Sequence, residues 1–223
     1  MFRLKIVAVV GGAMLAFFGI QEFRVSQGTS VEPIEVELVD IETGKASENN
    51  HVRLGEHFAI YPGSVYQYRQ GKYESGEPKG STSVDYTYYP VISADHRFFA
   101  ELGQLAEKYG TLDAVPDAEW PEIGSFSVLV KTKRFKTIRS IPESLTSENS
   151  VQGLVVNLIG GLDSEEEALL RESFPTIDVN KILIIEDGRH PASLAKSLGM
   201  AGGGIAISLL GVGGFLFGRS ETA

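Results

Sequence analysis

The chain has 223 residues, of which 43% are hydrophobic and 22% are charged, and its formal net charge is −9. It contains no cysteine, which excludes disulfide bonds, thiolate nucleophiles and cysteine-based zinc or iron–sulfur sites. The acidic balance weighs against a protein that binds nucleic acid with its whole surface, so we expect no nucleic-acid partner. The size suits one domain with additional apolar segments, and these segments lie at the two ends of the chain.

The N-terminal segment, residues 1–23, places Arg3 and Lys5 before an apolar stretch from Ile6 to Ile20. This pattern fits either a signal peptide or an uncleaved signal anchor that crosses the membrane. Cleavage needs small residues at the −3 and −1 positions, and "FFGIQEF" offers no good match. The sequence therefore favours an anchor that stays on the chain, and the basic residues before it predict a cytoplasmic N-terminus.

Strand and turn signals dominate the middle of the chain, residues 24–190. Alternation of apolar and acidic residues in "PIEVELVDI" predicts one half-buried strand over residues 33–41. Further strands are expected in "HVRLGEHFAIYP", "SVYQYRQGKY", "STSVDYTYYPVIS", "FSVLVKTKRFKTIRSIP" (two strands), "VQGLVVNLIG" and "KILIIED". Helices are expected in "RFFAELGQLAEKYG" and in "DSEEEALLRESF", which Pro175 ends. The predicted class is α+β: a mostly antiparallel domain, a small barrel or sandwich with one or two helices, flanked by two transmembrane helices.

The C-terminal segment, residues 191–223, contains an uncharged run from Leu198 to Gly218. As a helix this run is long enough to cross the hydrocarbon layer of a bilayer, and "PASLAKSL" extends it on the domain side. Arg189 and Lys196, on the domain side of this segment, favour the opposite orientation in the membrane. The first membrane helix usually determines the orientation, however. We therefore expect an integral protein of the cell (inner) membrane, with both tails cytoplasmic and the domain facing the periplasm or exterior.

Glycine and other small residues gather on one side of each apolar segment. In lipid, helices associate through close backbone approach, which small side chains permit. We therefore predict that the two helices pack together, or against a partner subunit, through these small faces. The glycines expected in the packing are Gly11, Gly12, Gly19, Gly199, Gly203, Gly214 and Gly218.

Signals for metal binding and catalysis are weak. His51 and His57 would share a face of an unbroken strand, but the sequence locates no third ligand for a metal. The acidic run 163–167 fits either a cation site or the first turn of a helix, with Asp163 and Glu166 at capping-box spacing, and the helix start is favoured. We therefore assign no catalytic residue, no metal site and no cofactor.

Two surface features are candidates for binding. Tyrosines crowd into residues 61–89, where a hairpin would bring two pairs together as a platform for a sugar or a peptide, although packing within the sheet is favoured. A basic cluster over residues 131–139 could meet phospholipid headgroups or an acidic partner, the alternative being a solvated strand edge protected by its lysines. The candidate residues are Tyr66, Tyr68, Tyr86 and Tyr88 in the platform and Lys131, Lys133, Arg134 and Lys136 in the cluster.

These features predict a two-span membrane protein whose exported domain is a binding or assembly module of the cell envelope, within a membrane complex. The expected partners are the lipid bilayer and another membrane protein or a second copy, with an envelope polymer as a further candidate. The alternative is a membrane-tethered hydrolase that acts on an envelope polymer. A pocket that gathers His51, His57 and carboxylates would favour the enzyme, whereas an aromatic or basic face would favour the binding module.

Overall fold

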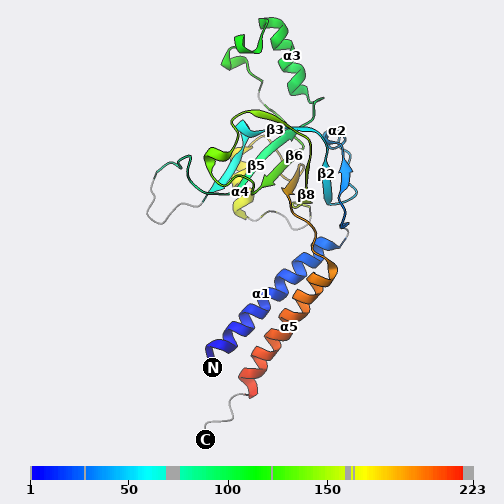
Figure 1. Ribbon diagram of the computed structural model, residues 1–223, viewed down its shortest axis with the longest axis vertical. Helices are drawn as coiled ribbons and strands as arrows, with labels where there is room; N and C mark the ends of the chain where they lie inside the picture. Colours follow the sequence, from blue (N-terminus) through cyan, green and yellow to red (C-terminus); the bar gives the residue numbers. More distant parts are fainter. Residues whose placement is uncertain are drawn as a thin grey trace. The chain divides into compact units, whose positions relative to one another are not determined.

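The computed structural model describes residues 2–27, 29–68, 76–121, 123–158, 162 and 164–217 (Figure 1). It divides into two compact units. One unit, called here the helical unit, comprises Met1–Val31 and His190–Ala223. The other, called the domain, comprises Glu32–Arg189 and is therefore inserted in the sequence between the two long helices of the helical unit.

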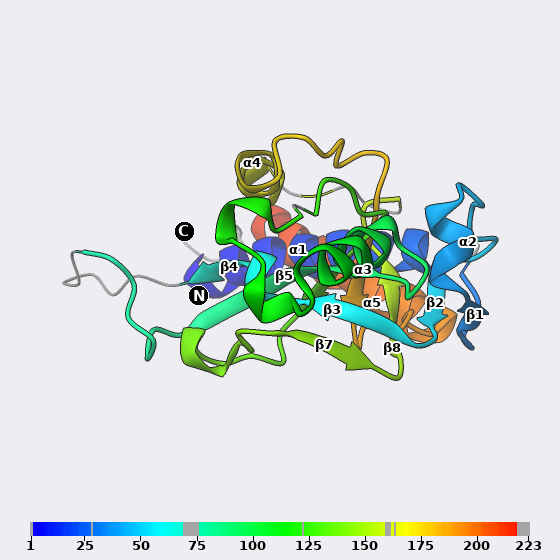
Figure 2. The same cartoon turned by 90° about the horizontal axis from the view of Figure 1, so that it is seen from above.

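The domain is built on one nine-stranded sheet with the strand order β1-β2-β8-β9-β6-β5-β3-β7, and β4 also pairs with β5. The strands are β1 (Ile34–Val36), β2 (His51–Leu54), β3 (His57–Ile60), β4 (Val65–Tyr68), β5 (Val84–Ile92), β6 (Val128–Thr132), β7 (Leu145–Glu148), β8 (Val151–Val155) and β9 (Leu183–Asp187). All pairs are antiparallel except β1 with β2 and β6 with β9. The sheet curls into a half-barrel (Figure 2).

The α+β class and the mainly antiparallel pairing are thus confirmed, but the architecture is an open half-barrel in place of a closed barrel or a sandwich. Closure would require the two end strands, β1 and β7, to pair with each other. Among the described residues each end strand has one partner, β2 for β1 and β3 for β7. Both are short, with three and four residues, so they offer few hydrogen-bonding groups for closure.

Three helices accompany the sheet: α2 (Leu38–Glu42), α3 (Arg97–Tyr109) and α4 (Ser164–Ser173). The two expected helices are confirmed as α3 and α4. The expected strand over 33–41 is wrong, because β1 ends at Val36 and α2 follows. Leu38 and Ile41 are both buried, and their spacing of three suits one face of a helix.

The expected second strand in residues 126–142 is also wrong. After β6 the chain makes a single bridge from Thr137 to Ser83 and then the 3-10 helix η4 (Ile138–Ser140). A capping box formed by Thr137 and Ser140 favours this turn over an extended strand. Strand β7, which the sequence analysis did not predict, follows at Leu145.

Both faces of the sheet carry a hydrophobic core. One core, on what we call the α2 face, contains Leu38 and Ile41 of α2 together with Tyr89 and Val91 of β5. The opposite core, on the α4 face, contains Leu170 of α4 and Phe98 of α3, with Tyr88 and Ile92 of β5. Successive residues of β5 therefore point to alternate faces, and every residue from Thr87 to Ile92 is buried.

The helical unit consists of α1 (Phe2–Ser26) and α5 (Leu194–Phe217), which lie side by side and antiparallel (Figure 1). The Ser208 hydroxyl donates a hydrogen bond to the Val9 carbonyl at 3.2 Å. Near the N-terminus of α1, the Lys5 ammonium donates to the Gly214 carbonyl, close to the C-terminus of α5. This pairing places the first turns of α1 beside the last turns of α5.

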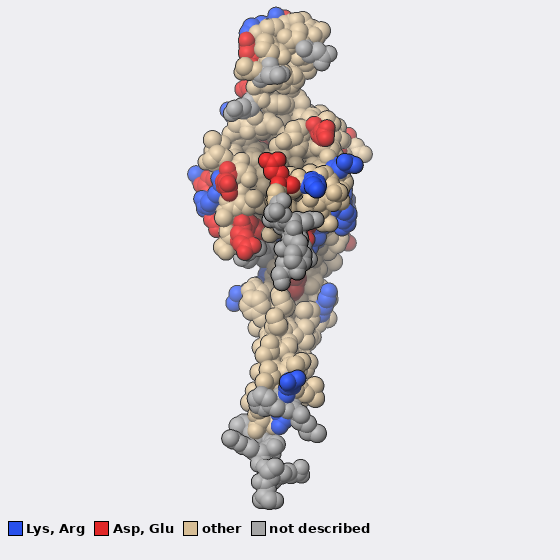
Figure 3. Space-filling model, turned by 90° about the vertical axis from the view of Figure 1, so that its left-hand side faces the viewer, with Lys and Arg blue, Asp and Glu red and all other residues tan. Residues whose placement is uncertain are grey.

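Each of these helices is long and apolar enough to cross a membrane. In the most apolar 18-residue segment of each helix, only 11% is buried. Such low burial differs from the buried core helix of a soluble protein. The face drawn in Figure 3 shows few charged side chains on this unit. The large apolar side chains that are at least half exposed are Leu4, Val7, Val10, Met14, Phe17 and Phe18 on α1 and Leu194, Leu198, Ile205, Leu209 and Leu210 on α5.

The close contact of the two helices depends on glycine. A Cβ atom added at Gly204 would overlap the backbone of Ala16, and one at Gly19 would overlap the backbone of Ala201. A Cβ atom at Gly12 would lie 2.5 Å from the Ser208 hydroxyl, and one at Gly211 would lie 2.7 Å from a methyl group of Val9. Four glycines therefore allow the backbones to approach.

Gly11, Gly199 and Gly203 take no part in the contact between α1 and α5, because a Cβ atom at any of the three meets nothing within 4 Å, and their expected role against a partner subunit stays a prediction. A Cβ atom at Gly214 would touch only the Lys5 side chain, at 3.5 Å. Gly218 lies outside the described residues. The glycines of α5 spread around much of its circumference, and one partner helix covers only a narrow stripe of it, which here contains Gly204 and Gly211.

Candidate functional site

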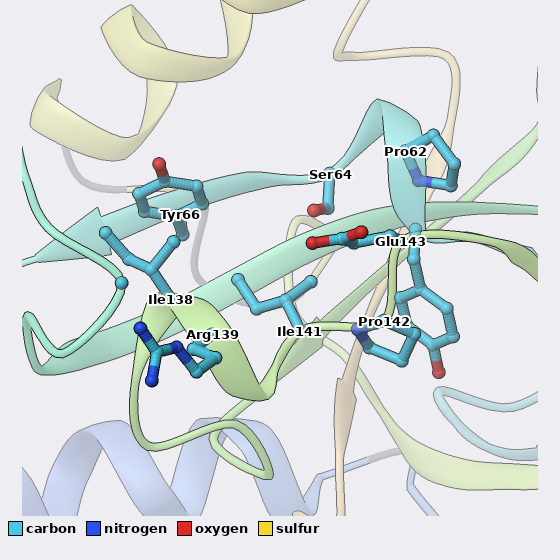
Figure 4. A pocket seen from close by; sticks show the side chains of 10 residues that line it. Pro62, Ser64, Tyr66, Ile138, Arg139, Ile141, Pro142 and Glu143 are labelled. Carbon is cyan, nitrogen blue, oxygen red and sulfur yellow. The ribbon is translucent and has the colours of Figure 1, made fainter.

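A pocket of about 410 Å³ opens on the domain, between the 3-10 helix η1 (Tyr61–Gly63), strand β4 and the segment from Ile138 to Glu143 (Figure 4). Its volume falls in the usual range of small-ligand pockets, about 300–1,000 Å³. Two of its residues, Tyr61 and Ile141, belong to the core of the α2 face, and Tyr66 packs against that core. The pocket is therefore built on that face of the sheet.

The pocket walls combine apolar and polar surface in similar proportions. Ile138 and Ile141 lie side by side beneath it, and the ring of Tyr66 closes one side (Figure 4). Pro62 and Pro142 form the opposite rim. The surface offered to a ligand thus includes rings and branched aliphatic groups, which bind apolar groups by excluding water, together with a comparable share of polar groups.

Besides the Tyr66 hydroxyl, three residues of the rim carry polar side chains. The Ser64 hydroxyl and the Glu143 carboxylate lie close together on one side, and the Arg139 guanidinium lies at the other end (Figure 4). Arg139 and Glu143 are exposed, and within the described part of the chain neither forms an ion pair. The pocket therefore presents opposite charges at its two ends.

Backbone hydrogen bonds fix the segment that carries Ile138 and Arg139. The Ile138 N–H donates to the Thr82 carbonyl at 3.2 Å, and the Arg139 N–H donates to the Gly80 carbonyl at 2.8 Å. The sequence folds in this way because the capping box described above ends the extended path at Thr137. The pocket wall is thus held rigidly against the chain that leads into β5.

A polar cluster lies behind the Tyr61 wall, and we call it the Tyr61 network: His57, Tyr61, Arg134 and Glu148. The Tyr61 hydroxyl donates to the Glu148 carboxylate. Arg134 donates to the same carboxylate at 2.7 Å and also to the Tyr61 hydroxyl. The Arg134 guanidinium lies 4.9 Å from the centre of the Phe135 ring, a cation–π distance. The network fixes the Tyr61 hydroxyl, and the Tyr61 ring itself is buried in the core.

The protonation states in this network follow from burial and hydrogen bonding. Burial, together with the hydrogen bond to Glu148, raises the pKa of Tyr61 well above its usual range, so the phenol keeps its proton. Burial alone would raise the pKa of the Glu148 carboxyl, but hydrogen bonds from Arg134 and Tyr61 outweigh it and lower this pKa below its ordinary value. Glu148 is therefore an ionised structural partner of Arg134 and is unsuited to act as a general acid near neutral pH.

The two histidines are buried and do not form a metal site. They do not share one strand, because the chain turns between β2 and β3, and this corrects the expectation of an unbroken strand. A ring nitrogen of His51 lies 3.3 Å from the Gln152 amide nitrogen. His57 donates through Nδ1 to the Gly55 carbonyl at 2.8 Å, and its Nε2 lies 3.8 Å from Glu148. The described residues contain no group of three or more His, Cys, Asp or Glu that could hold a metal ion.

The four tyrosines do not form a platform, because strand register separates them, and three of them pack against the sheet as the favoured interpretation has it. Val65 pairs with Tyr88 and Tyr66 pairs with Thr87, so Tyr66 lies on the α2 face and Tyr88 lies on the α4 face. Tyr86 also packs against the α4-face core. Only Tyr66 of the four lines the pocket, and the ring centre of Tyr68 lies 6.3 Å from that of Tyr66.

The basic residues likewise do not form one surface patch. Lys131 is buried and pairs with Glu166 of α4, which also accepts a hydrogen bond of 2.7 Å from the Tyr88 hydroxyl. Lys133 and Lys136 are exposed, and Lys136 donates to the Lys133 carbonyl at 3.1 Å. Arg134 belongs to the Tyr61 network.

Glu166 was expected only as an acid in the first turn of a helix. It does lie in the first turn of α4, but there it is a buried partner of Lys131. The other member of the expected capping box, Asp163, lies outside the described residues. The alternation within "VLVKT" places Lys131 on the same face as the core residue Leu129, which is the signal that could have identified Lys131 as buried.

Comparisons of this chain with models of protein families, with characterised proteins and with solved structures find no match.

Proposed function

We propose that this protein is a two-span protein of the cell (inner) membrane whose domain is a binding or assembly module that holds a partner in the pocket beside Tyr66. Both tails are cytoplasmic and the domain faces the periplasm or exterior. The observation that carries the proposal is the pocket itself: a hollow with both apolar and polar walls, a carboxylate from Glu143 and a guanidinium from Arg139.

The helical unit supports the membrane assignment. A pair of helices with large apolar side chains exposed along its length cannot remain dispersed in water, whereas lipid solvates these side chains. Antiparallel packing places both chain ends at one end of the pair, as two spans with both tails on one side require. Because α1 packs through Gly12 and Gly19 along α5, it has a structural role that favours its retention over cleavage.

The pocket supports binding over hydrolysis. The two histidines are buried in β2 and β3, and neither lines the pocket. Glu148 is engaged by Arg134 and Tyr61, which leaves Glu143 as the carboxylate at the pocket. One exposed carboxylate beside apolar walls provides an anchor for a ligand but not the acid and base pair that glycoside hydrolysis uses.

Photo-crosslinking in intact cells tests this function. We expect the photoreactive amino acid p-benzoylphenylalanine, placed at Arg139 on the pocket rim, to give a discrete crosslinked product on the full-length protein. The same amino acid at Lys136, which is exposed three residues earlier and does not line the pocket, is the matched control. The product at Arg139 should weaken when Tyr66→Ala is added. Equal products at both positions, or a product that ignores Tyr66→Ala, would show that the pocket is not the binding site.

A further inference from the structure

We propose that the occupant of this pocket is an extended, proline-containing peptide segment of a partner protein, with a basic residue that pairs with Glu143. This inference rests on the proposed function, because it names the class of ligand that the same pocket takes.

The shape and chemistry of the walls favour proline rings. The Tyr66 ring and the Pro62 and Pro142 rings present apolar surfaces beside the side chains of Ile138 and Ile141 (Figure 4), whereas the Tyr61 ring is buried in the core. Aromatic-lined grooves of this kind accept the ridges of a polyproline II helix. Such a ligand is preorganised, so it loses little conformational entropy on binding.

The backbone of the rim disfavours strand addition at this place. Pro62 and Pro142 have no N–H group, so two rim positions cannot donate to a β ladder. A polyproline II segment needs no ladder, because its carbonyl groups are solvated or accept isolated hydrogen bonds from side chains. The Ser64 hydroxyl lies at the pocket edge in a position to donate one such bond (Figure 4).

The charges at the rim set the composition and direction of the segment. Glu143 is exposed and has no ion-pair partner in the part of the chain that the structure describes, so an arginine or lysine of the ligand can pair with it. Arg139 at the opposite end repels that basic residue and can donate to a ligand carbonyl or carboxylate. The basic end of the ligand therefore lies toward Glu143 and Ser64.

A sugar chain fits these walls less well. Sugar hydroxyl groups need many hydrogen-bond partners, and the two isoleucines and two prolines supply none from their side chains. Tyr61 cannot compensate, because its hydroxyl is already bonded to Glu148 and Arg134. An oligosaccharide is thus the competing outcome that the experiment has to exclude.

The test uses the full chain in detergent micelles and a fluorescein-labelled, proline-rich decapeptide that ends in arginine. Fluorescence anisotropy should show saturable binding, which is lost when the prolines are replaced by glycine and alanine. Tyr66→Ala should weaken binding by at least about tenfold, as expected for a central aromatic contact, whereas Tyr109→Ala, on α3 and outside the pocket lining, should leave it unchanged. Circular dichroism spectra of both variants show whether they fold.

Glu143→Gln provides an independent arm, because Glu143 is exposed and its change leaves the core intact. We expect this variant to bind the arginine peptide several-fold more weakly and to lose the preference for that peptide over one ending in glutamine. Equal affinity for the proline and the glycine–alanine peptides would overturn the inference, as would saturable binding of a chitin tetrasaccharide in place of the peptide. If the peptide shows no saturable binding but the crosslink at Arg139 still depends on Tyr66, the inferred class of ligand is wrong while the proposed function stands.

Discussion

Lys131→Met is expected to lower the free energy of unfolding by about 3–5 kcal/mol, the range for removing one partner of a buried ion pair. The Lys131 and Glu166 side chains are each only 10% exposed, and they join β6 to α4 across the core of the α4 face. Methionine fills a similar volume, so the loss comes mainly from leaving the Glu166 carboxylate buried without its cation. Denaturant unfolding of the full chain in detergent micelles measures the change.

Two further variants separate this cause from a packing defect. The double variant Lys131→Met with Glu166→Leu removes both charges and should recover most of the lost stability, because neither charge is then left uncompensated. Lys133→Met, at an exposed position two residues away, should change stability little. A Lys131→Met variant as stable as the parent would contradict a buried pair at this position. So would a double variant whose loss of stability equals the sum of the losses caused by Lys131→Met alone and by Glu166→Leu alone.

Gly204→Leu is expected to separate α1 from α5, whereas Gly203→Leu should leave them paired. The two positions are neighbours in the same helix, so hydrophobicity and helix propensity change equally. They differ in what a side chain meets: at Gly204 it overlaps the Ala16 backbone, and at Gly203 it has open space. Because backbone atoms cannot move aside as a flexible side chain does, the helices themselves must part.

Disulfide crosslinking in isolated membranes measures this effect. The chain has no cysteine, so Val9→Cys and Ser208→Cys introduce the only pair of thiols, at positions joined by a hydrogen bond. Oxidation should link α1 to α5 intramolecularly in the parent and in the Gly203→Leu variant but only weakly in the Gly204→Leu variant. Similar crosslinking in all three proteins would show that the glycine contact does not hold the helices together.

The helices and most strands could be predicted from the sequence because their signals are local. The turn at Gly110 and the apolar stripe of Phe98 and Leu102 were sufficient to identify α3, and the strand of residues 183–187 followed from its composition. The expected strand over residues 33–41 was too long because Leu38 continues the alternation of Ile34 and Val36, and in so short a segment the helical spacing from Leu38 to Ile41 is a weak signal.

The candidate site was not predictable because long-range register creates it. Tyr66 and Tyr88 were both plausible members of a platform until the pairing of Val65 with Tyr88 placed them on opposite faces. Ile138 and Glu143 lie more than 70 residues from Tyr66 in the sequence, and only the fold brings them to one pocket. Lys131 fitted a basic surface cluster and Glu166 fitted the first turn of a helix, so neither local pattern indicated that the two residues pair.

The central claim is that two membrane spans present the pocket-bearing domain outside the cytoplasm, and protease accessibility tests it most directly. The full-length protein, tagged at its C-terminus, is expressed in Gram-negative cells that are then converted to spheroplasts and treated with protease, with a cytoplasmic protein as the control for intactness. We predict that residues 32–189 are degraded, that a fragment containing α5 and the tag stays protected, and that N-terminal sequencing of the untreated protein finds the start of α1 intact. A domain that survives in intact spheroplasts, or a mature chain that begins after Ile20, would contradict the claim.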